Sequence, residues 1–448
     1  MGVKLFKTAA AFAFAAASAS LCAADDGAAV FPVSCWTYMR FEQQTRPAES
    51  VVRDWKDLGI THPLMPVTSG RTDKAAVRRM LDLCGGAGLK VLMCDERVDN
   101  PAIMRLRDSR SIEAYRKGVR AALADWGSHP AVAGFYLYDE PDSNIVSAVC
   151  AAARVCREED PSKIWYLNLL PWYDWIGPRI GCQDYAVYLD RVAERSGLLS
   201  MGYDFYEQQN EVSGPAKGEN LHFLNLRQWM ELSVRRPGFR FSFTPICLDS
   251  YNYRVRSQDD LRWQINTAVA MGAKALVWYY PDMSSAVQGC SQNNRNAPIN
   301  VFGERTASFE WLSYENRLFQ RQYGSVFAGL SIESAWMTGE PLGGIAKFAG
   351  DADVAAVASP DRVLVSFFRD AGGVRYMAAV NLSRDFSRHV NFTFAPAVSP
   401  HQRVFTREWV KLATNADPVA ERDAGGRAPH RAGRYLAPGQ IILVRLDR

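Results

Sequence analysis

Two adjacent carboxylates, Asp139 and Glu140, end an apolar and aromatic run that starts at Gly134, and Pro141 follows them directly. A proline cannot donate to a sheet ladder, so we expect a β-strand to stop there. The two acids would then lie at the carboxyl end of that strand, where barrels and open α/β sheets place their active sites. A solvated loop would carry the same residues without any function, so the neighbouring segments decide between the two interpretations.

Further carboxylates follow the later strands of the chain. The large residues of the strand expected over 200–205 occupy alternate positions and would face the helices, which puts Asp204 on the opposite face, in the barrel mouth. Asp204 is therefore the first candidate for a second catalytic carboxyl. Asp249, after the next strand, and Glu207, beyond the regular strand, are the alternatives.

Aromatic side chains gather at the same strand ends. Sugar rings present C–H faces that pack on aromatic planes, and cleavage of a glycosidic bond uses two carboxyl groups that flank it. For any single aromatic residue, ordinary core packing is the competing interpretation. The candidate substrate-binding residues are Trp36, Tyr138, Tyr206, Trp278, Tyr280 and Asp249.

Strand-like and helix-like runs alternate eight times over the first part of the chain. The strands are expected at residues 31–38, 60–67, 90–94, 132–138, 164–170, 198–205, 240–248 and 275–280. The amphipathic stretches between them cover 75–84, 112–126, 145–158, 185–196, 221–234 and 259–271, and a last helix over 308–323 would close the unit. This alternation predicts a (β/α)8 TIM barrel, with a doubly wound open sheet as the main alternative.

The pattern changes from about residue 326. Short runs at 363–369, 376–382, 389–395, 403–408 and 440–446 are separated by turn residues, and the polar run 416–431 is expected to be a long surface loop. Such short strands are typical of an antiparallel β-sandwich. The expected organisation is therefore a signal peptide over 1–24, a catalytic barrel over 25–325 and a C-terminal β-sandwich over 326–448.

The first residues have the features of a secretory signal. Lys4 and Lys7 precede an alanine- and phenylalanine-rich core that is too short for a membrane span, and cleavage is expected before Asp25. We therefore expect an exported protein, periplasmic or extracellular. A lipid anchor on Cys22 is less favoured, because the preceding Leu21 is bulky. The formal charge of +4 falls to 4 − 2 = +2 without the two lysines, which gives no indication of a nucleic-acid partner.

No metal or organic cofactor is indicated. The eight cysteines after the signal form neither a CxxC pair nor a zinc-ligand spacing, and most lie in strand- or helix-like runs as buried small residues. The sequence has no HExxH, no GxSxG and no phosphate-binding glycine loop. Chemistry is therefore expected to rest on the carboxylates.

With these features the chain resembles the superfamily of (β/α)8-barrel glycoside hydrolases. It is most similar to β-galactosidase-like and uncharacterised secreted members whose fourth strand reads Tyr-Leu-x-Asp-Glu-Pro. The segments that carry the resemblance are 136–141, 203–206 and 272–280 in the barrel and 374–383 and 435–446 in the sandwich. The resemblance implies that Glu140 is the general acid/base.

The chain departs from that superfamily at two positions. Asp139 stands where the best-known clan has an asparagine, and an acidic neighbour would raise the pKa of Glu140. The seventh expected strand, residues 241–248, contains no glutamate, so the usual nucleophile does not transfer. The prediction is a glycosidase in which Asp204 opposes Glu140 as nucleophile or base. The alternatives are a catalytically inactive carbohydrate-binding protein of the same fold and an envelope scaffold in which the C-terminal domain is the working part.

Overall fold

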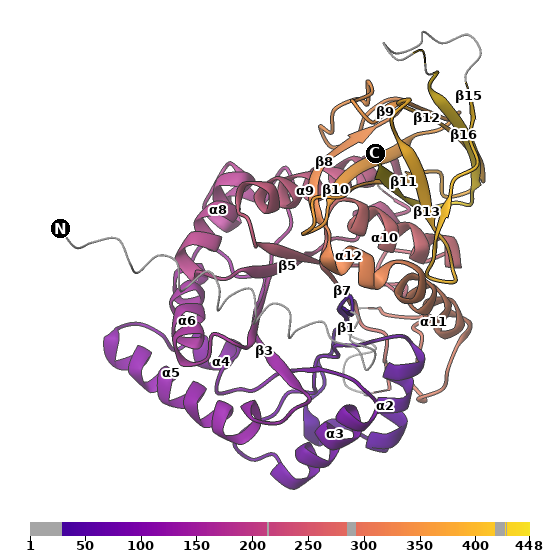
Figure 1. Ribbon diagram of the computed structural model, residues 1–448. Helices are drawn as coiled ribbons and strands as arrows, with labels where there is room; N and C mark the ends of the chain where they lie inside the picture. The colour runs from indigo at the N-terminus through magenta and orange to yellow at the C-terminus, as the bar shows by residue number, and fades with distance from the viewer. Residues whose placement is uncertain (1–28, 213–214, 285–292, 417–425, 427) are drawn as a thin grey trace, which may run out of the picture.

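The computed structural model describes residues 29–212, 215–284, 293–416, 426 and 428–448 (Figure 1). The expected signal peptide, with Cys22, lies outside the described residues, and so does most of the expected loop 416–431. Their assignments remain predictions.

Seven parallel strands form the sheet of the first unit. They are β1 (Val33–Cys35), β2 (Val91–Met93), β3 (Val132–Asp139), β4 (Ile164–Leu169), β5 (Ser200–Asp204), β6 (Arg240–Thr244) and β7 (Ala275–Trp278). Their order, β1-β7-β6-β5-β4-β3-β2, leaves β1 and β2 at the two edges of a curled sheet. The chain order of the strands is thus that of a barrel with one position between β1 and β2 still to be filled.

The segment 60–68 fills that position without forming a regular strand. The His62 N–H donates to Val33 O (2.9 Å), and on the other side the Met65 N–H donates to Leu92 O (2.9 Å). Pro63 interrupts the ladder because it has no N–H to donate, and Pro66 repeats the interruption three residues later. The expected second strand is therefore an extended but irregular segment and has no strand label. For this reason the expected fourth strand is labelled β3.

Helices surround this sheet, as Figure 1 shows. They are α2 (Ala48–Asp57), α3 (Lys74–Gly86), α4 (Asn100–Ile103), α5 (Ser109–Ala122), α6 (Val146–Glu159), α7 (Gly177–Ile180), α8 (Tyr185–Ser196), α9 (Pro215–Arg235), α10 (Gln258–Ala270), α11 (Ala307–Phe319) and α12 (Ser325–Gly329). Single turns occur at Phe41–Gln43, Leu123–Gly127, Glu207–Gln209 and Gln320–Gly324. The expected helix over 185–196 is confirmed, because the Asp184 side chain caps its first turn and Gly197 ends it in the left-handed region.

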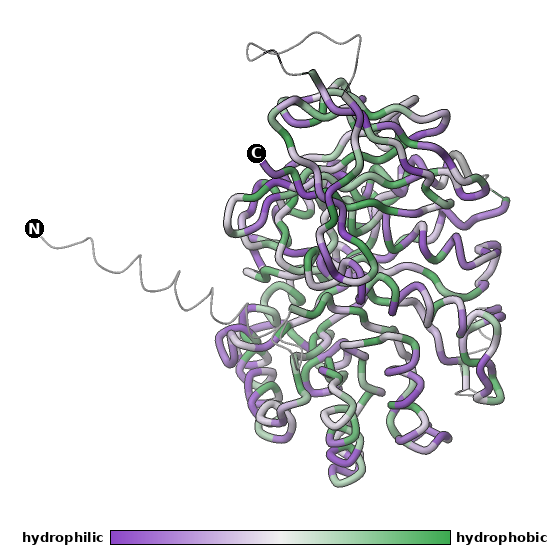
Figure 2. The backbone as a smooth tube through the Cα atoms, turned by 45° about the vertical axis from the view of Figure 1, so that its right-hand side comes forward, coloured by the Kyte–Doolittle hydropathy of each residue, from purple (hydrophilic) through white to green (hydrophobic). Residues whose placement is uncertain are grey.

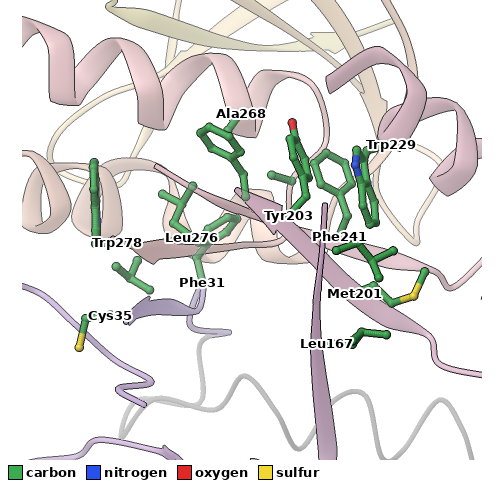
Figure 3. Close-up of a cluster of buried hydrophobic side chains, with 14 of the residues drawn as sticks. Phe31, Cys35, Leu167, Met201, Tyr203, Trp229, Phe241, Ala268, Leu276 and Trp278 are labelled. Atoms are coloured by element: carbon green, nitrogen blue, oxygen red, sulfur yellow. The ribbon is translucent and has the colours of Figure 1, made fainter. Parts of the chain in front are cut away.

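The core lies between the sheet and these helices. Met201, Tyr203 and Phe205 are fully buried, and the ring of Tyr203 stacks on Trp229 of α9 with centroids 5.2 Å apart (Figure 3). The alternation predicted for this strand is therefore correct. The seven described cysteines are free and all but Cys182 are buried, as expected of small core residues.

The C-terminal unit contains two antiparallel sheets. One has the order β14-β13-β17-β11-β10-β8 and the other β15-β16-β12-β9. The strands are β8 (Ser331–Met337), β9 (Val354–Ala358), β10 (Val363–Arg369), β11 (Arg375–Asn381), β12 (Arg388–Phe394), β13 (Ser399–Arg403), β14 (Trp409–Lys411), β15 (Asn415–Ala416), β16 (His430–Leu436) and β17 (Ile441–Asp447). Side chains such as Phe367, Met377 and Phe392 fill the space between the sheets, so the barrel-plus-sandwich fold is as predicted.

One expected strand of this unit is wrong. Arg403 ends β13, and residues 404–408, expected to continue a strand from 403, form the turn between β13 and β14, in which the Val404 N–H donates to Glu408 O (3.1 Å) and Arg407 has a positive φ of 69°. A left-handed residue breaks an extended run.

The sandwich packs directly on the last helices of the barrel. Trp263 of α10 donates its indole N–H to Leu382 O (3.1 Å), and Phe327 of α12 contacts the ring of Phe368 (5.4 Å between ring centroids).

No helix of the described residues is long and apolar enough to cross a membrane. Hydrophilic and hydrophobic residues are interspersed along the chain in Figure 2.

Candidate active site

A pocket of about 140 Å³ opens at the carboxyl ends of the barrel strands. Carboxylates and aromatic rings make up most of its wall. The lining residues are Trp36, Tyr38, Asp139, Glu140, Asn168, Asp204, Tyr206, Thr244, Ser250, Tyr251, Tyr253 and Tyr279.

A β-bulge in β3 aims Asp139 into this pocket. Tyr136 lies opposite Tyr166 of β4, and after a register shift Asp139 lies opposite Asn168. Strict alternation would have placed Asp139 on the helix side together with Leu137, which is fully buried in the core there. Bulges of this kind are common next to active sites because they redirect a side chain.

Glu140 follows the bulge in a strained backbone conformation. Its φ is +48°, in the left-handed region that non-glycine residues rarely adopt, and its N–H donates to Asn168 O (3.0 Å). About a third of its side chain is exposed, and Arg179 of α7 approaches it to 3.8 Å. Because it is partly exposed, Glu140 presents its carboxyl group at the mouth of the pocket. Backbone strain of this kind is concentrated at functional sites.

The amide of Asn168 joins two of the carboxylates. Its Nδ2 donates to Asp139 Oδ1 (3.0 Å) and to Asp204 Oδ1 (2.9 Å). The hydroxyl of Tyr166 donates to Asn168 Oδ1 (3.3 Å), which fixes the orientation of the amide. Asn168 was not predicted from the sequence. The sequence feature that could have indicated it is its position: Asn168 is a polar residue near the end of an otherwise apolar and aromatic strand.

Burial raises the pKa of all three carboxyl groups. For Asp139 and Glu140 the negative charge of Asp204 adds to this effect, and Glu140 also hydrogen-bonds to Asp204. The hydrogen bonds from Asn168 act in the opposite direction on the pKa of Asp139 and Asp204, and the charge of Arg179 does so for Glu140. Because three acids share one partly desolvated site, the site holds protons at a pH where isolated carboxyls are all ionised.

Aromatic rings form the rest of the wall. Tyr206 lies between Tyr279 and Tyr253, with ring centroids 5.2 and 5.9 Å away. Trp36 lines the pocket beside Tyr38, and its buried indole N–H has no hydrogen-bond partner among the described residues. Of the predicted aromatic binding residues, Trp36 and Tyr206 therefore lie in the pocket, accompanied by Tyr38, Tyr253 and Tyr279.

Two other predicted binding residues face away from the pocket. The bulge that turns Asp139 inward leaves Tyr138 on the side of the helices, where it packs against the core. Trp278 is fully buried in the same core (Figure 3), and its Nε1 donates to Asn316 Oδ1 of α11 (2.9 Å). Two-residue alternation along β7 gives the pocket position to Tyr279 instead.

Tyr280 and Asp249 also lie outside the pocket lining. Tyr280 is buried behind it against Tyr38, with centroids 5.5 Å apart. Asp249 turns away from the pocket and accepts hydrogen bonds from the Val255 N–H of its own loop (2.9 Å) and from Asn296 Nδ2 of the segment after β7 (2.8 Å). Its geometry is that of a residue that holds the loop together.

Glu207 supports the pocket from behind. It accepts hydrogen bonds from the Tyr253 hydroxyl (2.9 Å) and from Asn210 Nδ2 (2.9 Å). Its carboxylate therefore fixes the ring of Tyr253. In the part of the chain that the structure describes, no group of three or more His, Cys, Asp or Glu residues is arranged to hold a metal ion.

Comparisons with known proteins give matches in structure alone. No family model matches the chain, and no curated protein matches its sequence. A β-galactosidase from Bacillus circulans sp. alkalophilus aligns with a TM-score of 0.60 and 9% identity, over 93% of this chain and 99% of that one. A catalytic mutant of a GH42 β-galactosidase from G. stearothermophilus gives a TM-score of 0.60 and 8% identity, over 94% and 98%.

A cold-adapted β-galactosidase from Rahnella sp. R3 aligns over a shorter part. The TM-score is 0.52 at 11% identity, and the match covers 68% of this chain and 58% of that enzyme. At such identities the likeness shows the fold. The chain has the barrel-and-sandwich fold of glycoside hydrolases.

Proposed function

We propose that this protein hydrolyses O-glycosidic bonds of an oligo- or polysaccharide, with Glu140 as the general acid/base. The observation that carries the proposal is the position of Glu140: it is strained, partly exposed at the pocket mouth, and hydrogen-bonded to Asp204. The aromatic wall offers faces on which a sugar ring can pack. The glycoside hydrolase fold of the structural neighbours is consistent with this chemistry.

The raised pKa of Glu140 suits a proton donor. A carboxyl group that stays protonated near neutral pH can transfer its proton to the departing glycosidic oxygen as the C–O bond breaks. In the pocket Glu140 hydrogen-bonds to Asp204, and a bound substrate would replace Asp204 as the acceptor. Asp204, oriented by Asn168, is then the candidate nucleophile or the base that activates water.

The test is hydrolysis of a panel of aryl glycosides and polysaccharides by the purified protein. On any substrate that is cleaved, Glu140→Gln is expected to lower kcat by about 10²- to 10⁴-fold, because the variant keeps the shape but cannot donate the proton. Glu113→Gln, an exposed substitution on α5, is the matched control. Activity of Glu140→Gln within a few-fold of the natural protein would refute the role of Glu140.

A second candidate function is carbohydrate binding without catalysis. It is favoured by the part of the lining at the end of β6 and just after it. Thr244 and uncharged residues of 250–253 line the pocket there, whereas the best-known clan has its glutamate nucleophile on this strand. Calorimetry with the same panel separates the two. Saturable binding of a polysaccharide, together with no release of reducing ends after prolonged incubation, would support binding over hydrolysis.

Export is also a proposal, based on residues 1–24. Expression of the full chain in a bacterial host, followed by cell fractionation and N-terminal sequencing, tests it. We expect a mature protein that begins at Asp25 in the periplasmic or extracellular fraction. A full-length product in the cytoplasm would contradict this.

A further inference from the structure

A second, larger cavity lies at the other end of the barrel. It measures about 450 Å³ and is lined by residues at the amino-terminal ends of the strands, such as Pro32, Ile164, Arg240 and Ala275. The candidate active site is lined from the carboxyl ends of the same strands. The cavity is therefore separate from the carboxylate pocket.

Small residues on the inner face of the barrel leave this space open. Barrel interiors are usually filled by bulky branched side chains. Here the lining includes Ser34 of β1, Ser200 of β5, Ser242 of β6 and Ala275 of β7. The remaining wall is mainly apolar, with Leu92, Ile164 and Val277 among its residues.

Buried polar groups in the cavity wall lack a hydrogen-bond partner among the described residues. Among them are Ser34 Oγ and His62 Nε2, and each of these residues is 3% exposed. The other ring nitrogen of His62 lies 2.9 Å from Thr61 Oγ1, and burial lowers the pKa of His62 to about 4, so the ring is neutral at pH 7. Buried polar groups without partners are rare, and a water molecule retained beside a larger bound molecule would satisfy them.

The charge of the cavity has one sign. Arg157, Lys163, Arg240 and Lys274 line it, and no carboxylate occurs among its described lining residues. Lys163 donates to a neutral carbonyl, Val132 O (3.0 Å). Arg240 has no ion pair within the described part of the chain, and alternation along β6 places its side chain on the same face as that of Ser242. The cavity is thus lined by cations without a carboxylate, and its interior is mainly apolar apart from the serines and His62.

We propose that this cavity is a binding site for an apolar monocarboxylate. Its carboxylate would pair with Arg240 and Lys163 at the rim, and its apolar body would pack among Leu92, Ile164 and Val277. The volume lies within the range of small-molecule sites. Water is the competing occupant, but the space would hold roughly 15 molecules at their liquid volume, in a wall that offers few polar partners.

The experiment uses the whole protein and three probes: decanoate and decyltrimethylammonium below their micellar concentrations, and decan-1-ol below its solubility limit. Calorimetry is expected to show one decanoate per chain and a higher Tm on binding. The neutral alcohol should bind at least about tenfold more weakly, and the cation should not bind. No decanoate binding, or equal binding of all three probes, would overturn the proposal.

Two substitutions locate the site. Arg240→Gln should weaken decanoate binding by about 10- to 100-fold, because a charge-assisted hydrogen bond is lost. Arg110→Gln, the same change on the exposed face of α5, should leave it unchanged. Ser34→Leu should block binding by filling the cavity, and Ser242→Val serves if that variant does not fold. Decanoate binding that none of these changes alters would show that it binds elsewhere.

Discussion

At the scale of single residues, a small number of neighbouring groups sets the pKa values and the orientation of the site's carboxyl groups. Asn168 contacts Asp139 and Asp204 through one nitrogen, and Tyr166 holds the amide in place. Arg179 is the cation that approaches Glu140. Each of these neighbours acts on a pKa in a known direction, so the pH dependence of the reaction reports on them separately.

Asn168→Ala should move the acidic limb of the pH profile to higher pH. The substitution removes hydrogen bonds that favour the ionised forms of Asp139 and Asp204, so their pKa values rise. The step that needs an ionised carboxylate is then lost at a higher pH. The measurement is kcat/KM against pH. An unchanged acidic limb would show that neither carboxylate acts in its ionised form.

Glu140→Gln should unfold at a higher temperature than the natural protein at pH 8. The folded-state pKa of Glu140 is raised above its unfolded value of about 4.3, so the folded protein binds the proton more tightly. Its contribution to stability is fully present below the unfolded pKa and is lost progressively as the pH rises from there to the folded pKa of about 9. The uncharged glutamine avoids this loss.

The comparison therefore needs two conditions. Calorimetric scans at pH 8 and pH 4 should show a Tm gain for Glu140→Gln that disappears at the lower pH. A gain of equal size at both would point to packing as its cause, because both states of Glu140 are protonated at low pH. Glu113→Gln again supplies the exposed control.

At the scale of elements, alternation along each strand could be read from the sequence, but departures from it could not. The inward direction of Asp204 follows from the large residues on either side of it. Asp139 points inward because of a bulge, which no residue type announces. The two prolines in 60–68 do explain why that segment is irregular. Its pairing with β1 and β2, however, depends on neighbours distant in sequence.

The strand β7 gives a direct test of the corrected assignment. Trp278→Phe should lower the free energy of unfolding by about 1–2 kcal/mol, since it removes the hydrogen bond to Asn316 and some buried area, and should leave KM unchanged. Tyr279→Ala, one residue later, should raise KM, because it removes a ring from the pocket wall. Urea unfolding and steady-state kinetics measure both. A higher KM in Trp278→Phe would restore the original prediction for that residue.

At the scale of the whole molecule, the two units share a continuous apolar core. The hydrophobic cluster between the barrel sheet and its helices also includes Met337, Leu364 and Leu443 of the sandwich. Polar contacts reinforce it: Asn266 of α10 donates to Gly439 O (2.8 Å), and Tyr323 donates to Ile441 O (3.0 Å). We therefore expect one cooperative unfolding transition for the described chain.

Gly439→Ala should weaken this connection in a way that Gly373→Ala does not. Both glycines have positive φ (65° and 84°), so each substitution incurs a left-handed strain of roughly 1–2 kcal/mol. A Cβ on Gly439 would lie 2.6 Å from Trp263 Cα, whereas a Cβ on Gly373 meets nothing within 4 Å. Gly439→Ala should thus cost about 1–3 kcal/mol more in urea unfolding and split the transition in two. Equal losses for the two variants, with a single transition in both, would mean that this contact does not couple the sandwich to the barrel.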